Sequence, residues 1–268
     1  MMRVIIYTLL GVASLLMLIP LAYMISLSLQ TEAETLSAHA VLWPSSPQWG
    51  NYAELFVRAP FGNFIVNSLV VAGAITCTHL LFDPLVGYVF AKFRFPLRNT
   101  MFVALLATLM VPFFVRMIPL YVMMAQLNWL NSYQGLITPF LMDAFGIFLM
   151  RQFIQPIPDD LISAARIDGA SEFGIYRRII LPQTKPALAV LGLFTFVFQW
   201  NEFLWPLVAT STPEMRTIPV GLTLFNQEYF TLWQLTAAGS VILFVPTAVL
   251  FLVSQRYFVR GITLTGLR

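Results

Sequence analysis

The sequence carries little charge for its length. Asp, Glu, Lys and Arg make up only 10% of its 268 residues, whereas soluble domains carry about 25%. Hydrophobic residues account for 59%, and the mean hydropathy is +0.79. This number of charges is too small to cover a water-exposed surface. The composition therefore excludes a soluble domain and indicates an integral membrane protein.

Cysteine and histidine are also scarce. The single cysteine, Cys77, excludes an internal disulfide, and its apolar surroundings predict a small buried residue. The two histidines, His39 and His79, have no neighbours at metal-ligand spacing, so we expect no metal and no cofactor. The net charge of +3 is not gathered into a basic run that would bind nucleic acid.

Long apolar runs are what the sequence has in abundance. Each of six runs is long enough to cross the hydrocarbon core as a helix, and none shows the alternation of a β-barrel strand. The first is longer than the core of a signal peptide, so we expect it to be retained. The sequence therefore predicts an all-α protein with six transmembrane helices in one domain over residues 1–268, with its core at about 64–256. The predicted spans are Val4–Leu29, Phe64–Ala91, Thr100–Ala125, Tyr133–Gln152, Ala187–Thr210 and Trp233–Gln255.

The basic residues are divided unequally between the two sides of these spans. Arg58 and Arg216 flank one side, and Arg116 falls inside a span. Because cytoplasmic loops carry the excess of Lys and Arg, the distribution predicts that both termini are cytoplasmic. The other side holds Arg3, Lys92, Arg94, Arg98, Arg151, Arg166, Arg177, Arg178, Lys185, Arg256, Arg260 and Arg268.

Two loops on the opposite side are longer than the rest. Residues 30–63 contain PQWGNYAELFVRAPF, whose aromatic and polar pattern predicts a short amphipathic helix on the membrane surface. Residues 211–232 contain two prolines and a glycine, which predict an irregular loop. Neither loop is large enough to form a separate domain.

Residues 158–186, which we call the charged segment, lie between the fourth and fifth predicted spans. Asp159 and Asp160 favour a helix start, because acidic side chains stabilise a helix N-terminus. This compact unit is predicted either to dock against another protein or to rest on the bilayer as an amphipathic linker. Its expected elements are a helix over Leu161–Ile167, a turn at Gly169, a second helix from Ser171 through Arg178, and breaks at Pro182 and Pro186.

The charged segment resembles the cytoplasmic signature of ABC importer permeases: Glu-Ala-Ala, three residues, Gly, nine residues, Ile, any residue, Leu-Pro. Here Ala164-Ala165 precede Gly169 by three residues, and nine residues separate Gly169 from Ile179-Ile180-Leu181-Pro182. Ser163 stands where the family usually has Glu, which puts one ionic contact with the ATPase in question. Other similar stretches are Asn67-Ser68, Gly87–Ala91, Pro119–Tyr121, Arg151–Phe153, Trp200-Asn201 and Gln255–Thr263.

The resemblance, to the maltose and glycerol-3-phosphate branch of the family, implies a set of partners. These are a second homologous permease, two cytoplasmic ATPase subunits, an extracytoplasmic binding protein and the lipid of the inner membrane. The chain itself would be non-catalytic, and it has no phosphate-binding loop of the form GxxxxGK[ST]. The charged segment would sit in a cleft of the ATPase. The residues implied in this coupling are Ser163, Ala164, Ala165, Asp168, Gly169, Phe173, Ile179, Leu181 and Pro182.

Four ionisable residues fall within the predicted spans: Asp83, Arg116, Asp143 and Glu202. Such residues are costly in a membrane and usually functional. If both helices are straight, Arg116 and Glu202 lie at similar depths, roughly 22–24 Å from the cytoplasmic edge. They therefore form either a buried ion pair or part of a substrate path, together with Asp143.

Two further residues, Asn201 and Trp205, would then offer hydrogen bonds and a stacking face to a sugar. The resemblance thus implies import of a sugar or oligosaccharide. Arg116 leaves a second substrate class open, because guanidinium groups bind phosphate in a bidentate manner, and that class is a phosphorylated polyol such as glycerol-3-phosphate. A secondary transporter that works alone is a third alternative, although it would not explain a docking segment.

Overall fold

The computed structural model describes residues 2–37, 39, 41–226 and 231–265, and for residues 256–265 it describes only the helical backbone. The described chain is all-helical except for short connections and an isolated bridge between Asn226 and Thr231. Short 3-10 turns cover Thr108–Met110, Thr138–Phe140, Pro213–Met215 and Leu222–Phe225. The helices are α1 (Met2–Ser28), α2 (Glu32–Thr35), α3 (Gly50–Arg58), α4 (Phe61–Lys92), α5 (Arg98–Ala107), α6 (Phe113–Gln126), α7 (Tyr133–Ile137), α8 (Ala144–Ile154), α9 (Asp159–Ile167), α10 (Glu172–Ile175), α11 (Leu181–Gln183), α12 (Lys185–Trp200), α13 (Leu204–Ala209), α14 (Ile218–Gly221) and α15 (Trp233–Thr265).

Three described helices are long and apolar enough to cross a membrane by themselves: α1, α4 and α15. Three bent pairs bring the total to as many as six crossings, if each pair is one span. The bends are 96° between Arg98–Met110 and α6, 41° between Tyr133–Phe140 and α8, and 80° between Glu172–Gln183 and α12. The expected all-α, polytopic architecture is confirmed.

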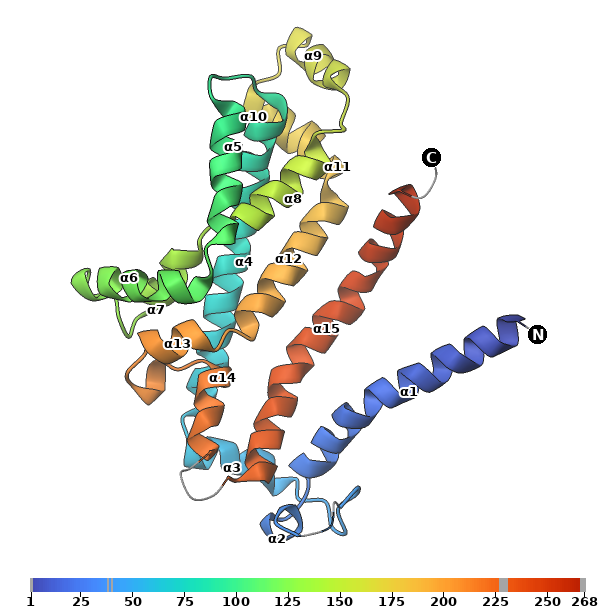
Figure 1. Ribbon diagram of the computed structural model, residues 1–268, viewed down its shortest axis with the longest axis vertical. Helices are drawn as coiled ribbons and strands as arrows, with labels where there is room; N and C mark the ends of the chain where they lie inside the picture. Colours follow the sequence, from blue (N-terminus) through green and yellow to red (C-terminus); the bar gives the residue numbers. More distant parts are fainter. Residues whose placement is uncertain (1, 38, 40, 227–230, 266–268) are drawn as a thin grey trace.

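The central element is α4, whose 32 residues extend for about 48 Å. Helices α8 and α12 pack along it (Figure 1). Gly87 permits the close approach of α8, because a Cβ atom at this position would lie 2.9 Å from the Cβ of Met150 and 3.0 Å from the amide nitrogen of Arg151.

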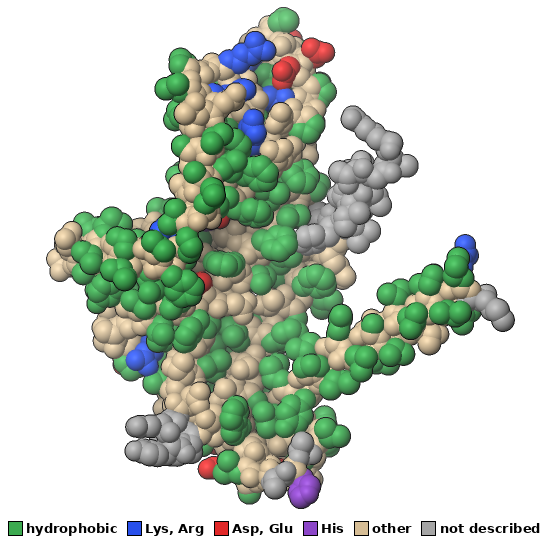
Figure 2. All heavy atoms as spheres, in the orientation of Figure 1, with side chains coloured by type: hydrophobic (Ala, Val, Ile, Leu, Met, Phe, Trp, Pro, Cys, Tyr) green, Lys and Arg blue, Asp and Glu red, His purple; other side chains and the backbone are tan. Residues whose placement is uncertain are grey.

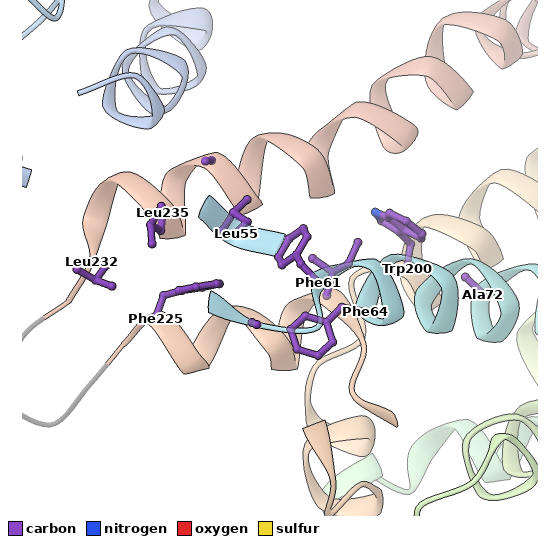
Figure 3. Packing of buried hydrophobic residues seen from close by; sticks show 11 residues of the cluster. Leu55, Phe61, Phe64, Ala72, Trp200, Phe225, Leu232 and Leu235 are labelled. Atoms are coloured by element: carbon purple, nitrogen blue, oxygen red, sulfur yellow. The ribbon is translucent and has the colours of Figure 1, made fainter. Parts of the chain in front are cut away.

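One hydrophobic core lies at the end of α4 that carries α3. Phe61 and Phe64 from the first turn of α4 pack with Leu55 of α3, Trp200 of α12 and Leu235 of α15 (Figure 3). All five side chains are buried, and burial of each large apolar side chain contributes about 1.5–3 kcal/mol. This cluster fixes the first and last parts of the chain to the α4–α12 pair.

A second core lies at the other end of α4, under the charged segment. Tyr88 of α4 and Met150 of α8 contact Ile162, Ile175 and Ile180, which come from the charged segment. Lys and Arg side chains gather on the surface at this end of the molecule (Figure 2). The charged segment is therefore packed onto the helix bundle rather than extended away from it.

The N-terminal part of α1 extends away from the bundle (Figure 1), and the most apolar 18-residue stretch of the helix is 0% buried, whereas its C-terminal part contacts α15. Its C-terminal end is anchored where Ser28 bonds the hydroxyl of Tyr52 at 2.8 Å. Asn51 donates to the carbonyls of Ser28 and Gln30, both at 2.9 Å. The expected first helix is confirmed, and so is a short helix, α3, in the next loop; its place on the membrane surface stays a prediction.

Three predicted spans are wrong as continuous helices. The fourth, Tyr133–Gln152, is interrupted between Phe140 and α8, with a bend of 41°. The third, Thr100–Ala125, breaks at Val111 and Pro112, because proline lacks an amide donor and forces the preceding residue out of the helical region. The fifth, Ala187–Thr210, breaks between α12 and α13. The expectation that Cys77 is buried is also wrong, because this residue is exposed on the surface of the chain.

Candidate functional site

The charged segment folds as the predicted pair of short helices. Helix α9 ends at Ile167, and Gly169 then adopts φ = +78°, which L-residues with side chains rarely adopt. The amide of Ala170 donates to the carbonyl of Ala165 at 2.9 Å and so closes the turn. Ser171 caps α10 by accepting from the amide of Gly174 at 3.2 Å.

The second helix continues further than the sequence indicated. Beyond α10 it passes through a π-helical turn, Tyr176–Ile180, into α11. It ends at Thr184, where the chain turns by 80° into α12. Pro182 lies inside α11 and Pro186 lies inside α12, so the chain breaks between the two prolines, at Thr184, and not at either of them.

The exposed part of the charged segment combines charged side chains with small and apolar ones. Ile167 is 86% exposed and Phe173 is 65% exposed. Of the remaining predicted coupling residues, Ala165, Ile179 and Leu181 are half-buried, whereas the exposed ones are Ser163, Ala164, Asp168, Gly169 and Pro182.

Two ion pairs stabilise the charged segment. Arg166 donates from Nε and Nη2 to the two carboxylate oxygens of Glu172, at 2.7 and 3.2 Å, and this hydrogen bonding lowers the pKa of Glu172. Lys92 of α4 donates to Asp159 at 2.7 Å and likewise lowers the pKa of that carboxyl group. Both carboxylates therefore remain charged at neutral pH and hold α9 in place.

The residues predicted for a substrate path do not form the expected pair. Arg116 lies exposed on α6, and the part of the chain that the structure describes contains no ion pair between it and Glu202. The Glu202 carboxylate instead accepts from the amides of Leu204 and Trp205, at 3.0 and 3.1 Å, and so caps α13. The equal-depth argument is wrong, because the 96° bend before α6 removes the straight helix on which it depended.

The remaining path candidates are also placed differently from expectation. Trp205 is buried and donates from Nε1 to the carbonyl of Gly135 at 3.0 Å, so its ring offers no free stacking face in this subunit. Asn201 is exposed but donates to the carbonyl of Val197 at 2.8 Å. Asp143 is exposed at the N-terminus of α8.

Sequence reasoning missed a buried polar pair on α4. His79 Nδ1 lies 2.8 Å from Asp83 Oδ2, and His79 Nε2 bonds the carbonyl of Phe140 at 2.9 Å. The Asp83 carboxylate also lies against Gly146, in the first turn of α8. The pair thus contacts both sides of the break, Phe140 before it and Gly146 after it. Its i, i+4 spacing was the available signal, but the sequence does not show that the fourth span is broken.

Among the described residues, no group of three or more His, Cys, Asp or Glu side chains is arranged to hold a metal ion. The comparisons with known proteins then decide the family. Residues 84–264 match the family described as "Binding-protein-dependent transport system inner membrane component".

The chain belongs to this family of inner-membrane transport components.

This chain is similar to curated permeases whose names give different substrates. It is 35% identical to the arabinooligosaccharides transport system permease protein AraQ of Bacillus subtilis, with 95% of this chain and 92% of that protein covered. It is 36% identical to the sn-glycerol-3-phosphate transport system permease protein UgpE of Yersinia pestis, with 92% and 91% covered. The chain is therefore a multi-pass ABC permease of the inner membrane.

Solved structures share the fold of this permease. A bacterial ABC transporter involved in the import of the acidic polysaccharide alginate matches with a TM-score of 0.83 and 25% identity, over 96% of both chains. The MetNI methionine ABC transporter matches with a TM-score of 0.56 and 17% identity, over 75% of this chain. The arrangement of helices in this chain is therefore one that solved ABC importers share.

Proposed function

We propose that the chain forms half of the translocation pathway of an ATP-driven importer for a sugar or oligosaccharide. A second homologous permease supplies the other half, two cytoplasmic ATPase subunits hydrolyse ATP, and an extracytoplasmic binding protein delivers the substrate. The names of the arabinooligosaccharide relative and the alginate transporter support the substrate class. Both termini and the charged segment lie in the cytoplasm, as the distribution of Lys and Arg predicts.

The observation that carries this proposal is the exposed face of the charged segment. Ile167, Phe173 and the small residues around Gly169 are exposed beside the charged Arg166 and Asp168, so the segment offers a mixed apolar and charged surface at the end of α4, α8 and α12. An ATPase cleft that closes on this surface moves the segment as a body, because its other face is packed into the core below. The attached helices then tilt, which alternates access to the pathway.

A test of the coupling uses the backbone of Gly169. Gly169→Pro cannot adopt φ = +78°, because the proline ring fixes φ near −65°. Gly169→Asn is the matched control, since Asn tolerates the left-handed region and a Cβ atom here meets nothing within 4 Å. In the reconstituted complex we expect ATP-dependent uptake to be lost in the Pro variant and kept in the Asn variant. Equal uptake by both variants would contradict the proposal.

A phosphorylated polyol is the second candidate substrate. The glycerol-3-phosphate relatives are as similar to this chain as the sugar relatives are, and the exposed Arg116 on α6 suits an anion. Vesicles that contain the complex and its binding protein are offered radiolabelled arabinooligosaccharide and sn-glycerol-3-phosphate in turn. We expect accumulation of the sugar. Accumulation of glycerol-3-phosphate alone supports the second candidate, and uptake by the isolated chain without ATPase supports a secondary transporter.

A further inference from the structure

Lys92, the last residue of α4, is attached to the charged segment and the connector before it by its ammonium group. Nζ donates to Asp159 Oδ1 at 2.7 Å, to the carbonyl of Gln155 at 3.1 Å and to the carbonyl of Ile157. The side chain of Lys92 is only 5% exposed. An ammonium group has three donors, so all its hydrogen-bonding capacity is directed to the α8–α9 connector and the start of α9.

A second contact lies one helical turn earlier on the same face of α4. Tyr88 donates its hydroxyl to Glu172 Oε2 at 3.3 Å, and Glu172 is held in turn by Arg166. The ring of Tyr88 lies 5.6 Å from that of Tyr176. Residues four apart share a helix face, so one face of α4 contacts both helices of the charged segment.

The opposite half of α4 is attached to the loop before α14. Asn67 Nδ2 donates to the carbonyls of Glu214 and Arg216, at 2.7 and 2.9 Å. Ser68 Oγ accepts from the amide of Ile218 at 2.9 Å. Asn67 and Ser68 are both buried although they are polar. A single continuous helix therefore bears hydrogen-bonded contacts to the charged segment at one end and to residues 214–218 toward the other.

Chain connectivity alone attaches the charged segment to α8 and α12, not to α4. We infer that Lys92 and Asn67 are positioning residues that make α4 a transmission element between the ATPase side and the loop at residues 214–218. The inference rests on the proposed function. About 25 residues of continuous helix, or roughly 38 Å, separate the two attachments, and this stretch, which includes Pro84, is held by α8 and α12 packed along it. Docking of the binding protein at the outer loop is thereby reported to the ATPase.

The test measures how strongly the substrate-loaded binding protein stimulates ATP hydrolysis by the complete complex. Lys92→Met keeps the apolar stem and removes the three hydrogen bonds, and Asn67→Ala removes the outer attachment. We expect each to reduce the stimulation ratio roughly fivefold or more. A merely structural role would lower the yield of complex without changing this ratio. The matched controls Arg94→Met and Asn63→Ala alter exposed residues nearby and should keep the wild-type ratio.

The double variant Lys92→Met/Asn67→Ala sharpens the result. Because both residues act on one path, the stimulation ratio of the double variant should fall as far as that of the more severe single variant. It should not fall by the product of the two single reductions. Independent, multiplied losses or an unchanged ratio in either single variant would overturn the inference. If Lys92→Met does not assemble, Asp159→Asn replaces it, and we expect a smaller reduction because the two carbonyl contacts remain. If the wild-type chain does not copurify with an ATPase, that result contradicts the proposed function instead of this inference.

Discussion

At the scale of single residues, some glycines of this chain mark where helices touch. Gly146 of α8 faces the buried carboxylate of Asp83, and a Cβ atom at Gly146 would lie 2.0 Å from Oδ2 and 2.8 Å from Cγ. The neighbouring carboxylate is braced by His79 and is completely buried, so it has little room to move. The absence of a side chain at this position thus allows the polar pair on α4 to reach the start of α8.

Gly146→Ala should therefore destabilise the protein by about 1–3 kcal/mol, the usual cost of overpacking a core. Thermal unfolding of the detergent-solubilised protein measures the change as a lower Tm. Gly73→Ala on α4 is the control, since nothing lies within 4 Å of a Cβ atom there. An equal Tm for the two variants would show that the carboxylate of Asp83 is free to shift.

The residues predicted for the substrate path show that position in the sequence does not determine the role of a side chain. Glu202 was expected either to pair with Arg116 or to line a path, and Trp205 was expected to offer a stacking face; in the structure Glu202 caps α13 and Trp205 is buried. Their types and positions were visible in the sequence, but their roles depend on a helix break. By contrast, Gly169 and Ser171 were placed correctly, because a left-handed turn and an N-cap are local requirements that the sequence expresses directly.

At the scale of elements, continuous helices were predicted well and broken ones were not. Hydropathy found α4 and α15 within a few residues of their observed starts, because a long apolar run is itself the signal. The same measure joined α5 to α6 across Pro112, since proline is tolerated inside many membrane helices. The direction of α6 depends on its contacts with α13, which lies about 90 residues later.

Helix α2 is an element whose stability should depend on pH. Glu34 accepts from the amide and hydroxyl of both Thr31 and Ser45, and its pKa is lowered to about 2, most strongly by the hydroxyl of Ser45. A carboxyl group with a lowered pKa stabilises the fold above its unfolded value of 4.5 and loses this contribution as the pH falls toward 2. We expect the loop at residues 29–49 to become sensitive to pepsin over that range.

The loop of Glu34→Gln should already be sensitive to pepsin near pH 4.5, and its cleavage should change little as the pH falls toward 2. Glu32→Gln is the matched control, because that carboxylate lies in the same helix and makes none of these hydrogen bonds. Rates of cleavage within residues 29–49, followed by mass spectrometry, give the comparison. As the pH falls, cleavage of the wild-type loop should approach that of Glu34→Gln. If the ratio of the two rates does not change, the role of Glu34 is contradicted.

At the scale of the whole molecule, the two ends of α4 differ in charge. Described Lys and Arg side chains gather around the charged segment, whereas α2 and α3 lie at the opposite end (Figures 1 and 2). The sequence predicted this asymmetry from flanking residues, although Arg268 lies outside the described residues and the side chains of Arg256 and Arg260 are not described. The predicted irregular loop at 211–232 is likewise described only outside residues 227–230.

The orientation can be measured with single cysteines in a Cys77→Ser background. Ser46→Cys and Asp168→Cys are both at exposed positions, at opposite ends of the molecule. A membrane-impermeant maleimide should label the first in intact spheroplasts and the second only after the membrane is permeabilised, because the distribution of Lys and Arg predicts that residue 168 lies in the cytoplasm. The reverse pattern would invert the topology.

The interruptions at residues 111–112, 141–143 and 201–203 have a consequence for solvent. Each one leaves backbone amides and carbonyls without helical partners in the interior of a bilayer. Hydrocarbon cannot satisfy them, so such groups persist only against protein or in water. Asp143 and Asn201 are exposed at two of these interruptions, and Arg116 lies one turn beyond the third. If each bent pair is one span, the flank of the subunit that carries α6 and α13 therefore faces protein or water, rather than lipid, at these interruptions.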